Sequence, residues 1–146
     1  MPAWDQNLPP STTLAKPEPA KPPAQVLAEA EQQWIFTAAE LSQTPSILDG
    51  MPEEQERENR NKGIGFITQV GIMLKLPQLT LTTAGIFFHR FLMRRSLVRR
   101  EGVKFVHHYE IAAVSVFLAT KIEETCRKVK ELVIACCRVA QKNPQL

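Results

Sequence analysis

The sequence has 146 residues, of which 44% are hydrophobic and 7% aromatic, and its formal net charge is +3. This length suits one domain of ordinary size or a part of a larger one, with enough apolar residues for a buried core. The positive charge is too small to argue by itself for nucleic acid as the partner.

Neither disulfides nor a membrane span is expected. The three cysteines, Cys126, Cys136 and Cys137, lack the Cys-x-x-Cys spacing, which favours a reducing compartment. The longest apolar run, from Ile111 to Ala119, is far shorter than the roughly 20 residues that span a bilayer. The N-terminus has no basic start followed by an apolar stretch, so no secretory signal is predicted and we expect an intracellular protein.

The chain begins with a proline-rich segment, because the first 23 residues hold seven of the eleven prolines. With few large apolar side chains this segment cannot offset the entropy of ordering, and we predict a disordered tail over 1–23. A PxxP-type ligand at Pro19 to Pro22 is the functional alternative, and we favour the plain tail.

The remaining residues, 24–146, are predicted to be all-α. A short helix is expected at about 25–33, and Thr37 with Glu40 has the form of a capping box at the start of another. The tripeptide 44–46, Thr-Pro-Ser, is expected to close that second short helix.

Four longer helices follow, predicted at about 53–75, 79–95, 107–121 and 128–141. In the first, Gly63, Gly65 and Gly71 weaken the helix, and their expected use is close approach by a neighbouring helix. The third is apolar almost all round from 111 to 119, so we expect it to be central and surrounded. The fourth is expected to direct these residues inward: Val129, Leu132, Val133, Cys136, Val139 and Ala140.

No catalytic, metal or cofactor site is predicted. The histidines and cysteines lack the paired spacing of zinc ligands, and no nucleotide-binding or serine-nucleophile motif occurs. Glu123 and Glu124 are adjacent, so on a helix they would point about 100° apart and could not face one substrate as an acid–base pair.

A basic stretch follows the second long helix. It is a candidate for binding phosphates of nucleic acid or of a phosphorylated peptide. The alternative is that cations gather at a helix C-terminus because the helix dipole favours them there. No aromatic residue is interleaved to stack on bases, so we favour the alternative and expect no direct contact with nucleic acid. The candidate residues are Arg94, Arg95, Arg99, Arg100 and Lys104.

The stretch 117–132, FLATKIEETCRKVKEL, carries an apolar helix into a charged cluster with no Gly or Pro between them. Lys121 would lie beside the last carbonyls of the central helix and could reach a second chain. A solvated charge cluster is the alternative, and spacing alone favours it.

In this order, several motifs resemble the first half of a cyclin box. The stretches are 70–76, which begins with Val-Gly and ends in Leu, 80–92, which ends in His-Arg-Phe-Leu, and 117–124, which reads FLATKIEE. The segments 34–37 (WIFT) and 44–46 (TPS) resemble transcriptional cyclins, the K, T and L types and the fungal cyclin subunits of C-terminal-domain kinases. The likeness covers about residues 33–143.

The resemblance implies a non-catalytic regulatory subunit in the nucleus. Such cyclins dock on a cyclin-dependent kinase, pack against its αC helix and thereby place the kinase Lys–Glu pair in its active arrangement. Transcriptional members direct the kinase to the C-terminal repeats of RNA polymerase II.

The resemblance also implies roles for particular residues. Lys121 matches the cyclin lysine that bonds the kinase near αC, and Glu123 and Glu124 match the acidic pair beside it. Phe117, which opens this stretch, is assigned to the same kinase-binding surface. The Pro-Pro that often follows is replaced by Thr-Cys at 125–126, so the shape of this loop stays open.

Other matching residues are assigned to the architecture of the box. Arg60 matches the arginine of the first box helix, and Gly71 belongs to the same helix. His89 stands where cell-cycle cyclins have an aspartate, as in transcriptional members, so their Arg–Asp ion pair is not carried over.

A cyclin box has five helices, and the partner glutamate of the lysine lies on the fifth. The sequence ends after four predicted box helices, so we expect a partial box that exposes the apolar area meant for the fifth. Two alternatives stay open: a module like transcription factor IIB that contacts nucleic acid through residues 90–104, and an inactive cyclin fragment.

Overall fold

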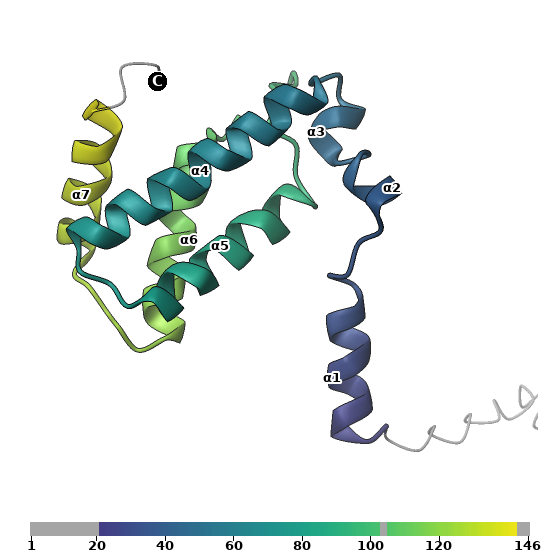
Figure 1. The fold of residues 1–146 in the computed structure, drawn as a ribbon, viewed down its shortest axis with the longest axis horizontal. Coiled ribbons are helices and arrows are strands. Elements are labelled where there is room, and N and C mark those ends of the chain that lie inside the picture. The colour runs from purple at the N-terminus through teal and green to yellow at the C-terminus, as the bar shows by residue number, and fades with distance from the viewer. Residues whose placement is uncertain (1–20, 103–104, 143–146) are drawn as a thin grey trace, which may run out of the picture. The chain divides into compact units, whose positions relative to one another are not determined.

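A computed structural model describes residues 21–102 and 105–142, which are all helix, turn or loop without a strand (Figure 1). The prediction of an all-α fold is therefore confirmed within these ranges. The predicted disordered tail lies almost wholly outside them, and its last residue, Pro23, begins a helix. The chain divides into two units, 1–35 and 36–146, each described here by itself.

The first unit contains helix α1, Pro23–Gln32. Proline in its first turn is tolerated because no N–H is needed there. All its residues are exposed, including Val26 and Leu27, and an ion pair of 2.8 Å joins Lys21 to Glu29. The helix predicted at 25–33 is thus confirmed, beginning two residues earlier.

Two short helices open the second unit, α2 at Ala38–Leu41 and α3 at Pro45–Leu48. The predicted capping box is present: Glu40 N–H donates to Thr37 Oγ1 at 3.3 Å, and Thr37 N–H donates to the Glu40 carboxylate at 2.7 Å. The prediction for 44–46 was wrong, because this tripeptide begins α3 instead of ending α2. Pro45 occupies the first helical position after an extended Thr44, which suits a helix start.

The four long helices lie close to their predicted positions: α4 at Glu53–Met73, α5 at Gln78–Leu92, α6 at His108–Ile122 and α7 at Val129–Lys142. Figure 1 shows α4 and α5 side by side with α6 crossing them, and α6 contacts α4, α5 and α7. Their shared core is apolar. Its fully buried members are Val70, Ala84, Phe88, Leu92, Ala112, Val116 and Ala119.

Two of the three predicted glycine contacts exist. A Cβ at Gly63 would lie 2.1 Å from Phe88 Cζ, and one at Gly71 would lie 2.2 Å from Leu81 Cδ2, so α4 approaches α5 closely at both. The prediction fails at Gly65, where a Cβ would meet nothing within 4 Å.

The expectation that α6 is central is confirmed by its contacts with α4, α5 and α7, but the expectation that it is surrounded was wrong. Its neighbours α4, α5 and α7 leave one flank open, where Val114 is 57% and Leu118 46% exposed. On α7 the inward row is Leu132, Ala135 and Val139, whereas Val129 and Val133 are at least half exposed. An apolar side chain shows only that a flank can be covered, and the neighbouring helices decide which one is.

In the described residues no helix combines the length and hydropathy needed to traverse a bilayer.

Candidate protein interface

The C-terminal end of α6 presents Lys121 to solvent. The side chain is exposed, and its Nζ lies 5.3 Å from the centroid of the half-buried Phe117 ring, within range of a cation–π interaction. No carboxylate in 21–102 or 105–142 forms an ion pair with this ammonium. Lys121 and Phe117 therefore form one amphipathic feature whose charge is available to a carboxylate on another chain.

The two adjacent glutamates after Lys121 have different surroundings. Glu123 is half-buried, and its Oε1 accepts a hydrogen bond of 2.7 Å from Thr83 Oγ1 on α5. Glu124 is exposed and has a left-handed backbone, with φ of 53°. The Glu123 carboxylate is thus held against α5, whereas the Glu124 side chain is exposed to solvent, so the two carboxylates have separate surroundings.

A second hydroxyl pair ties the α6–α7 loop to α5. Thr80, which is fully buried, lies 3.0 Å from Thr125 through the two Oγ1 atoms. This contact answers the question left by the Thr-Cys at 125–126: the loop is held by a hydroxyl pair to α5. Sequence reasoning missed Thr80, Thr83 and Thr125, because nothing in their spacing shows that residues 40 to 45 positions apart meet.

An apolar groove runs along the open flank of α6. It lies between α5 and α6 and has a volume of about 400 Å³. Leu118, in its wall, lies three residues before Lys121 on α6, and Lys121 itself is not among the lining residues. The lining residues are Phe87, Phe91, Val106, Glu110, Ile111, Val114, Ser115 and Leu118.

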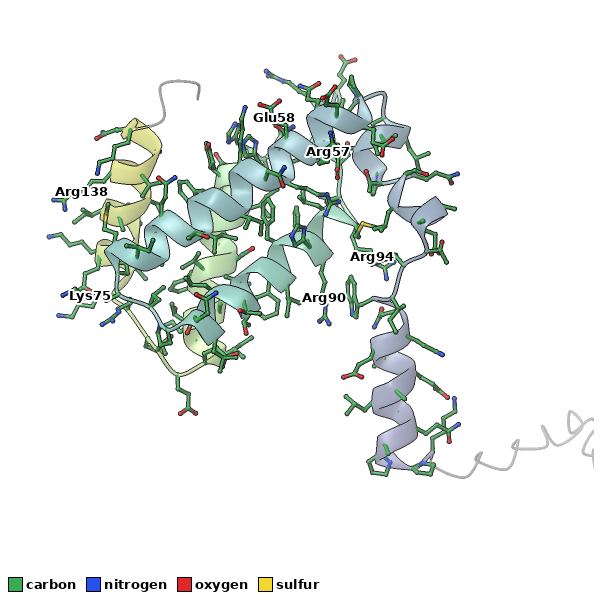
Figure 2. The ribbon with its side chains drawn as sticks, in the orientation of Figure 1. Arg57, Glu58, Lys75, Arg90, Arg94 and Arg138 are labelled. Carbon is green, nitrogen blue, oxygen red and sulfur yellow. The ribbon has the colours of Figure 1, made fainter. Side chains whose placement is uncertain are left out.

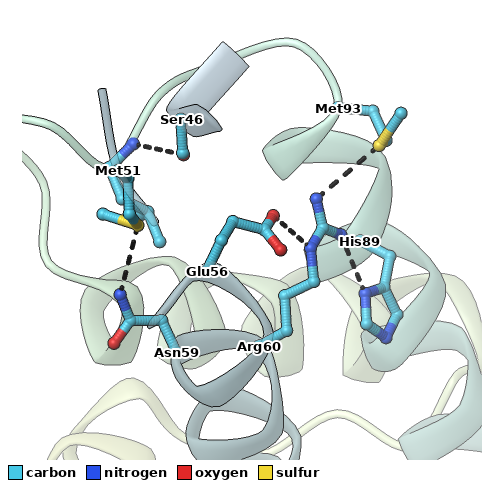
Figure 3. Close-up of polar contacts among 8 residues, drawn as sticks. Ser46, Met51, Glu56, Asn59, Arg60, His89 and Met93 are labelled. Atoms are coloured by element: carbon cyan, nitrogen blue, oxygen red, sulfur yellow. Dashed lines mark hydrogen bonds and ion pairs between the residues drawn. The ribbon is translucent and has the colours of Figure 1, made fainter. Parts of the chain in front are cut away.

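Arg60 organises a polar cluster between α4 and α5 (Figure 3). Its Nε donates to Glu56 Oε1 at 2.5 Å, its Nη1 lies 3.2 Å from His89 Nδ1, and its Nη2 lies 3.6 Å from Met93 Sδ. Because a guanidinium can only donate, His89 Nδ1 must accept, which requires a neutral ring with its proton on Nε2.

The electrostatics of His89 agree with that assignment. Burial and then the positive charge of Arg60 lower the pKa of His89, while Glu56 opposes them. Glu56 is 5% exposed, so Arg60 neutralises a buried carboxylate and links it to α5. The structure therefore places Arg60 and His89 in direct contact through a hydrogen bond.

The predicted basic stretch is divided by the structure. Arg94, Arg95 and Arg100 line a cleft of about 210 Å³, whereas Arg99 is exposed outside it and Lys104 lies outside the described residues. Figure 2 shows Arg90 and Arg94 projecting around the C-terminal end of α5.

Arg100 has an internal partner. Arg100 forms an ion pair with Asp49, whose side chain is 7% exposed, and Leu97 N–H donates to Ser46 Oγ at 3.0 Å in the same region. Both contacts connect the segment after α5 to α3 and the residue that follows it, across 51 positions. Arg100 thus joins two parts of the fold, which the sequence did not indicate.

The described residues contain no group of three or more His, Cys, Asp or Glu placed to hold a metal. Burial, and then Cys137 beside it, raises the pKa of Cys136 to about 11, so this thiol stays protonated and is a poor ligand or nucleophile.

Comparison with known proteins identifies relatives. Residues 31–145 match the family described as "Cyclin, N-terminal domain". The chain is 52% identical over 111 residues to cyclin pch1 of Schizosaccharomyces pombe, covering 76% of this chain and 31% of that protein.

Plant and animal relatives are also similar. Identity is 35% over 116 residues to cyclin-T1-5 of Arabidopsis thaliana, covering 79% of this chain and 19% of the relative. Identity is 40% over 100 residues to cyclin-L1 of Danio rerio, covering 68% of this chain and 19% of the relative. The chain thus spans less than a third of the length of these curated relatives.

Proposed function

The chain belongs to the cyclin family, whose members are non-catalytic regulatory subunits, and on this premise we propose that it binds and activates a cyclin-dependent kinase acting in transcription. The substrate of that kinase would be the C-terminal repeats of RNA polymerase II, and the protein would work in the nucleus. Likeness to T- and L-type cyclins supports this choice over a cell-cycle role.

The observation that carries the proposal is the exposed Lys121, three residues after Leu118, which lines the apolar groove. An ammonium without an ion-pair partner in the described chain, beside half-exposed apolar side chains, suits a partner that presents a carboxylate next to an apolar helix face. We assign Lys121, Phe117 and Glu124 to this contact surface.

Calorimetry tests the proposal. The chain is titrated with a purified cyclin-dependent kinase that phosphorylates the polymerase repeats, and in parallel residues 31–145 replace the matching segment of the fission-yeast relative. We expect binding in the second format at least, and about tenfold weaker binding on Lys121→Ala, as for the loss of a charge-assisted hydrogen bond.

Lys142→Ala is the matched control, because it removes the same charge from an exposed site at the end of α7. The proposal is wrong if neither format binds. The role of Lys121 is wrong if its replacement changes the affinity no more than that of Lys142.

We still predict that residues 90–104 do not bind nucleic acid directly. Arg100 is engaged with Asp49, which weakens the case for a continuous phosphate-binding surface. A DNA affinity that falls steeply with salt would contradict this prediction, because each phosphate contact releases counterions.

A further inference from the structure

The hydrogen bonds between α5 and the α6–α7 loop suggest a role beyond packing. Thr80 and Thr83 lie three residues apart, so they share one face of α5. Their hydroxyls reach Thr125 at 3.0 Å and Glu123 at 2.7 Å. We call these four residues the loop anchor.

Both contacts are of a kind that fixes geometry. The bond from Thr83 to the Glu123 carboxylate is charge-assisted, which makes it shorter and stronger than a bond between neutral groups. Thr80 is fully buried, and a buried hydroxyl requires a partner, which Thr125 provides. Loss of the Thr125 partner would leave the buried Thr80 hydroxyl without the hydrogen bond that it makes in the folded chain.

The residue between the two anchored positions is in a costly conformation. Glu124 has φ of 53°, and a left-handed backbone is unfavourable for a residue with a side chain, because the Cβ approaches the following carbonyl oxygen. Such a conformation persists where its surroundings determine it, and here the anchored Glu123 and Thr125 flank it on both sides. The anchor therefore selects one path for the loop.

Lys121 is linked to the loop anchor through the backbone of the last turn of α6. It lies two residues before Glu123, and Glu123 N–H donates to Ala119 O at 2.9 Å, which closes the last turn of α6 around Lys121. If Glu123 were released, that turn would be free to fray, because helix ends lack further hydrogen-bond partners.

We propose that Thr83 and Thr80 are positioning residues that fix the last turn of α6 and so orient Lys121 for the kinase, and that Glu123 belongs to this anchor and not to the contact surface. The inference rests on the proposed function for its effect on binding. It changes the role that the resemblance implied for Glu123, from contact to support.

Paired threonines on α5 provide the first test. Thr83→Val removes the anchoring hydroxyl without changing the shape of the side chain, and Thr82→Val removes a neighbouring hydroxyl that bonds only Gln78 O of its own helix. We expect Thr83→Val to weaken kinase binding about fivefold and Thr82→Val to leave it unchanged. Equal affinities for the two variants would overturn the proposal.

Two replacements of Glu123 distinguish a role in holding the α6–α7 loop from direct contact with the kinase. Gln retains an oxygen that accepts from Thr83, whereas Ala does not. We expect Glu123→Gln to bind nearly as well as the wild type and Glu123→Ala to bind about fivefold more weakly. Equal losses on both would show that the charge of Glu123 meets the kinase directly, contrary to the proposal.

A double variant tests the link to Lys121. In a Lys121→Ala background, Thr83→Val should weaken binding less than twofold, because its effect passes through Lys121. A further fivefold loss would show that the hydroxyl acts by another route.

Hydrogen exchange distinguishes failure of this inference from failure of the proposed function. The amides of 122–126 should exchange faster in Thr83→Val than in Thr82→Val, with or without a kinase. If the wild type binds no kinase, the proposed function fails while exchange still decides on the anchor. Unchanged exchange would overturn the anchor itself.

Discussion

The two flanks of α6 carry similar residues in opposite surroundings. Ala112, Val116 and Ala119 are fully buried against the neighbouring helices. Val114 and Leu118, on the same helix and equally apolar, are about half exposed in the groove beside α5. The difference shows that the closed flank supplies stability, whereas the open one is a surface available to other chain segments.

The closed flank faces a tightly packed interior that tolerates few substitutions. Gly63 and Phe88 bring α4 and α5 together, and the Arg60 cluster neutralises a buried carboxylate at the edge of the same contact. The groove has no comparable constraint in the described residues. Substitutions should therefore be costly in the interior and nearly neutral for folding at the exposed positions of the groove, Val114 and Leu118.

The largest effect is expected at the Arg60 cluster. Arg60→Leu leaves Glu56 buried without its charge partner, which should lower the free energy of unfolding by about 3–4 kcal/mol. Arg57→Leu, on the same helix, breaks only an exposed pair of 3.9 Å with Glu54 and should cost less than about 0.5 kcal/mol. Urea denaturation measures both. Equal midpoints would show that the cluster does not stabilise the interior.

The next effect is steric. Gly63→Ala places a Cβ against the fully buried Phe88 ring and should cost about 2–3 kcal/mol. Gly65→Ala has open space and should gain up to about 1 kcal/mol from helix propensity. Thermal unfolding of the two variants should thus shift in opposite directions, and a stabilised Gly63→Ala would contradict the close packing of α4 on α5.

Two valines on α6, one on each flank, test the difference between the closed flank and the open one. Val116→Ala removes methyl groups from the core and should cost about 2 kcal/mol, whereas Val114→Ala should cost less than about 0.5 kcal/mol. Calorimetric unfolding of each variant measures the difference. A substantial loss at Val114 would mean that the groove is covered in the folded chain in solution.

Much of this fold was predictable because its signals are local. Helix periodicity, proline positions and the Thr37–Glu40 capping box are read within a few residues, and the long helices lie close to their predicted ends. The α3 helix was missed because a Thr-Pro sequence can close one helical turn or begin another.

The arrangement of the site was less predictable because it depends on distant contacts. The resemblance indicated Lys121, and its exposure agrees with a surface role, which remains a proposal. The bond from Thr83 to Glu123 joins positions 40 apart, and the pair of Arg100 with Asp49 joins positions 51 apart. No periodicity within one helix encodes such pairs.

The smallest predicted effect concerns pH and the start of α6, on its closed flank. Burial lowers the pKa of His108 to about 4, with the nearby charges of His107 and Lys62 adding to the shift. His108 is 9% exposed, and among the described residues its Nε2 has no hydrogen-bond partner. The folded chain therefore holds this ring neutral where the unfolded chain, with a pKa near 6.5, takes up a proton.

The contribution of His108 is complete above about pH 6.5, falls as the pH drops toward about 4 and then levels off. At pH 5 the loss should be about 1–2 kcal/mol, measured as the difference between the wild type and His108→Phe in urea denaturation at several pH values. His107→Asn, which keeps an acceptor for the Tyr109 N–H at the helix start, should retain most of the pH dependence. If His108→Phe shows the same slope as the wild type, the ring is not held neutral, and the start of α6 is as open to water as the groove.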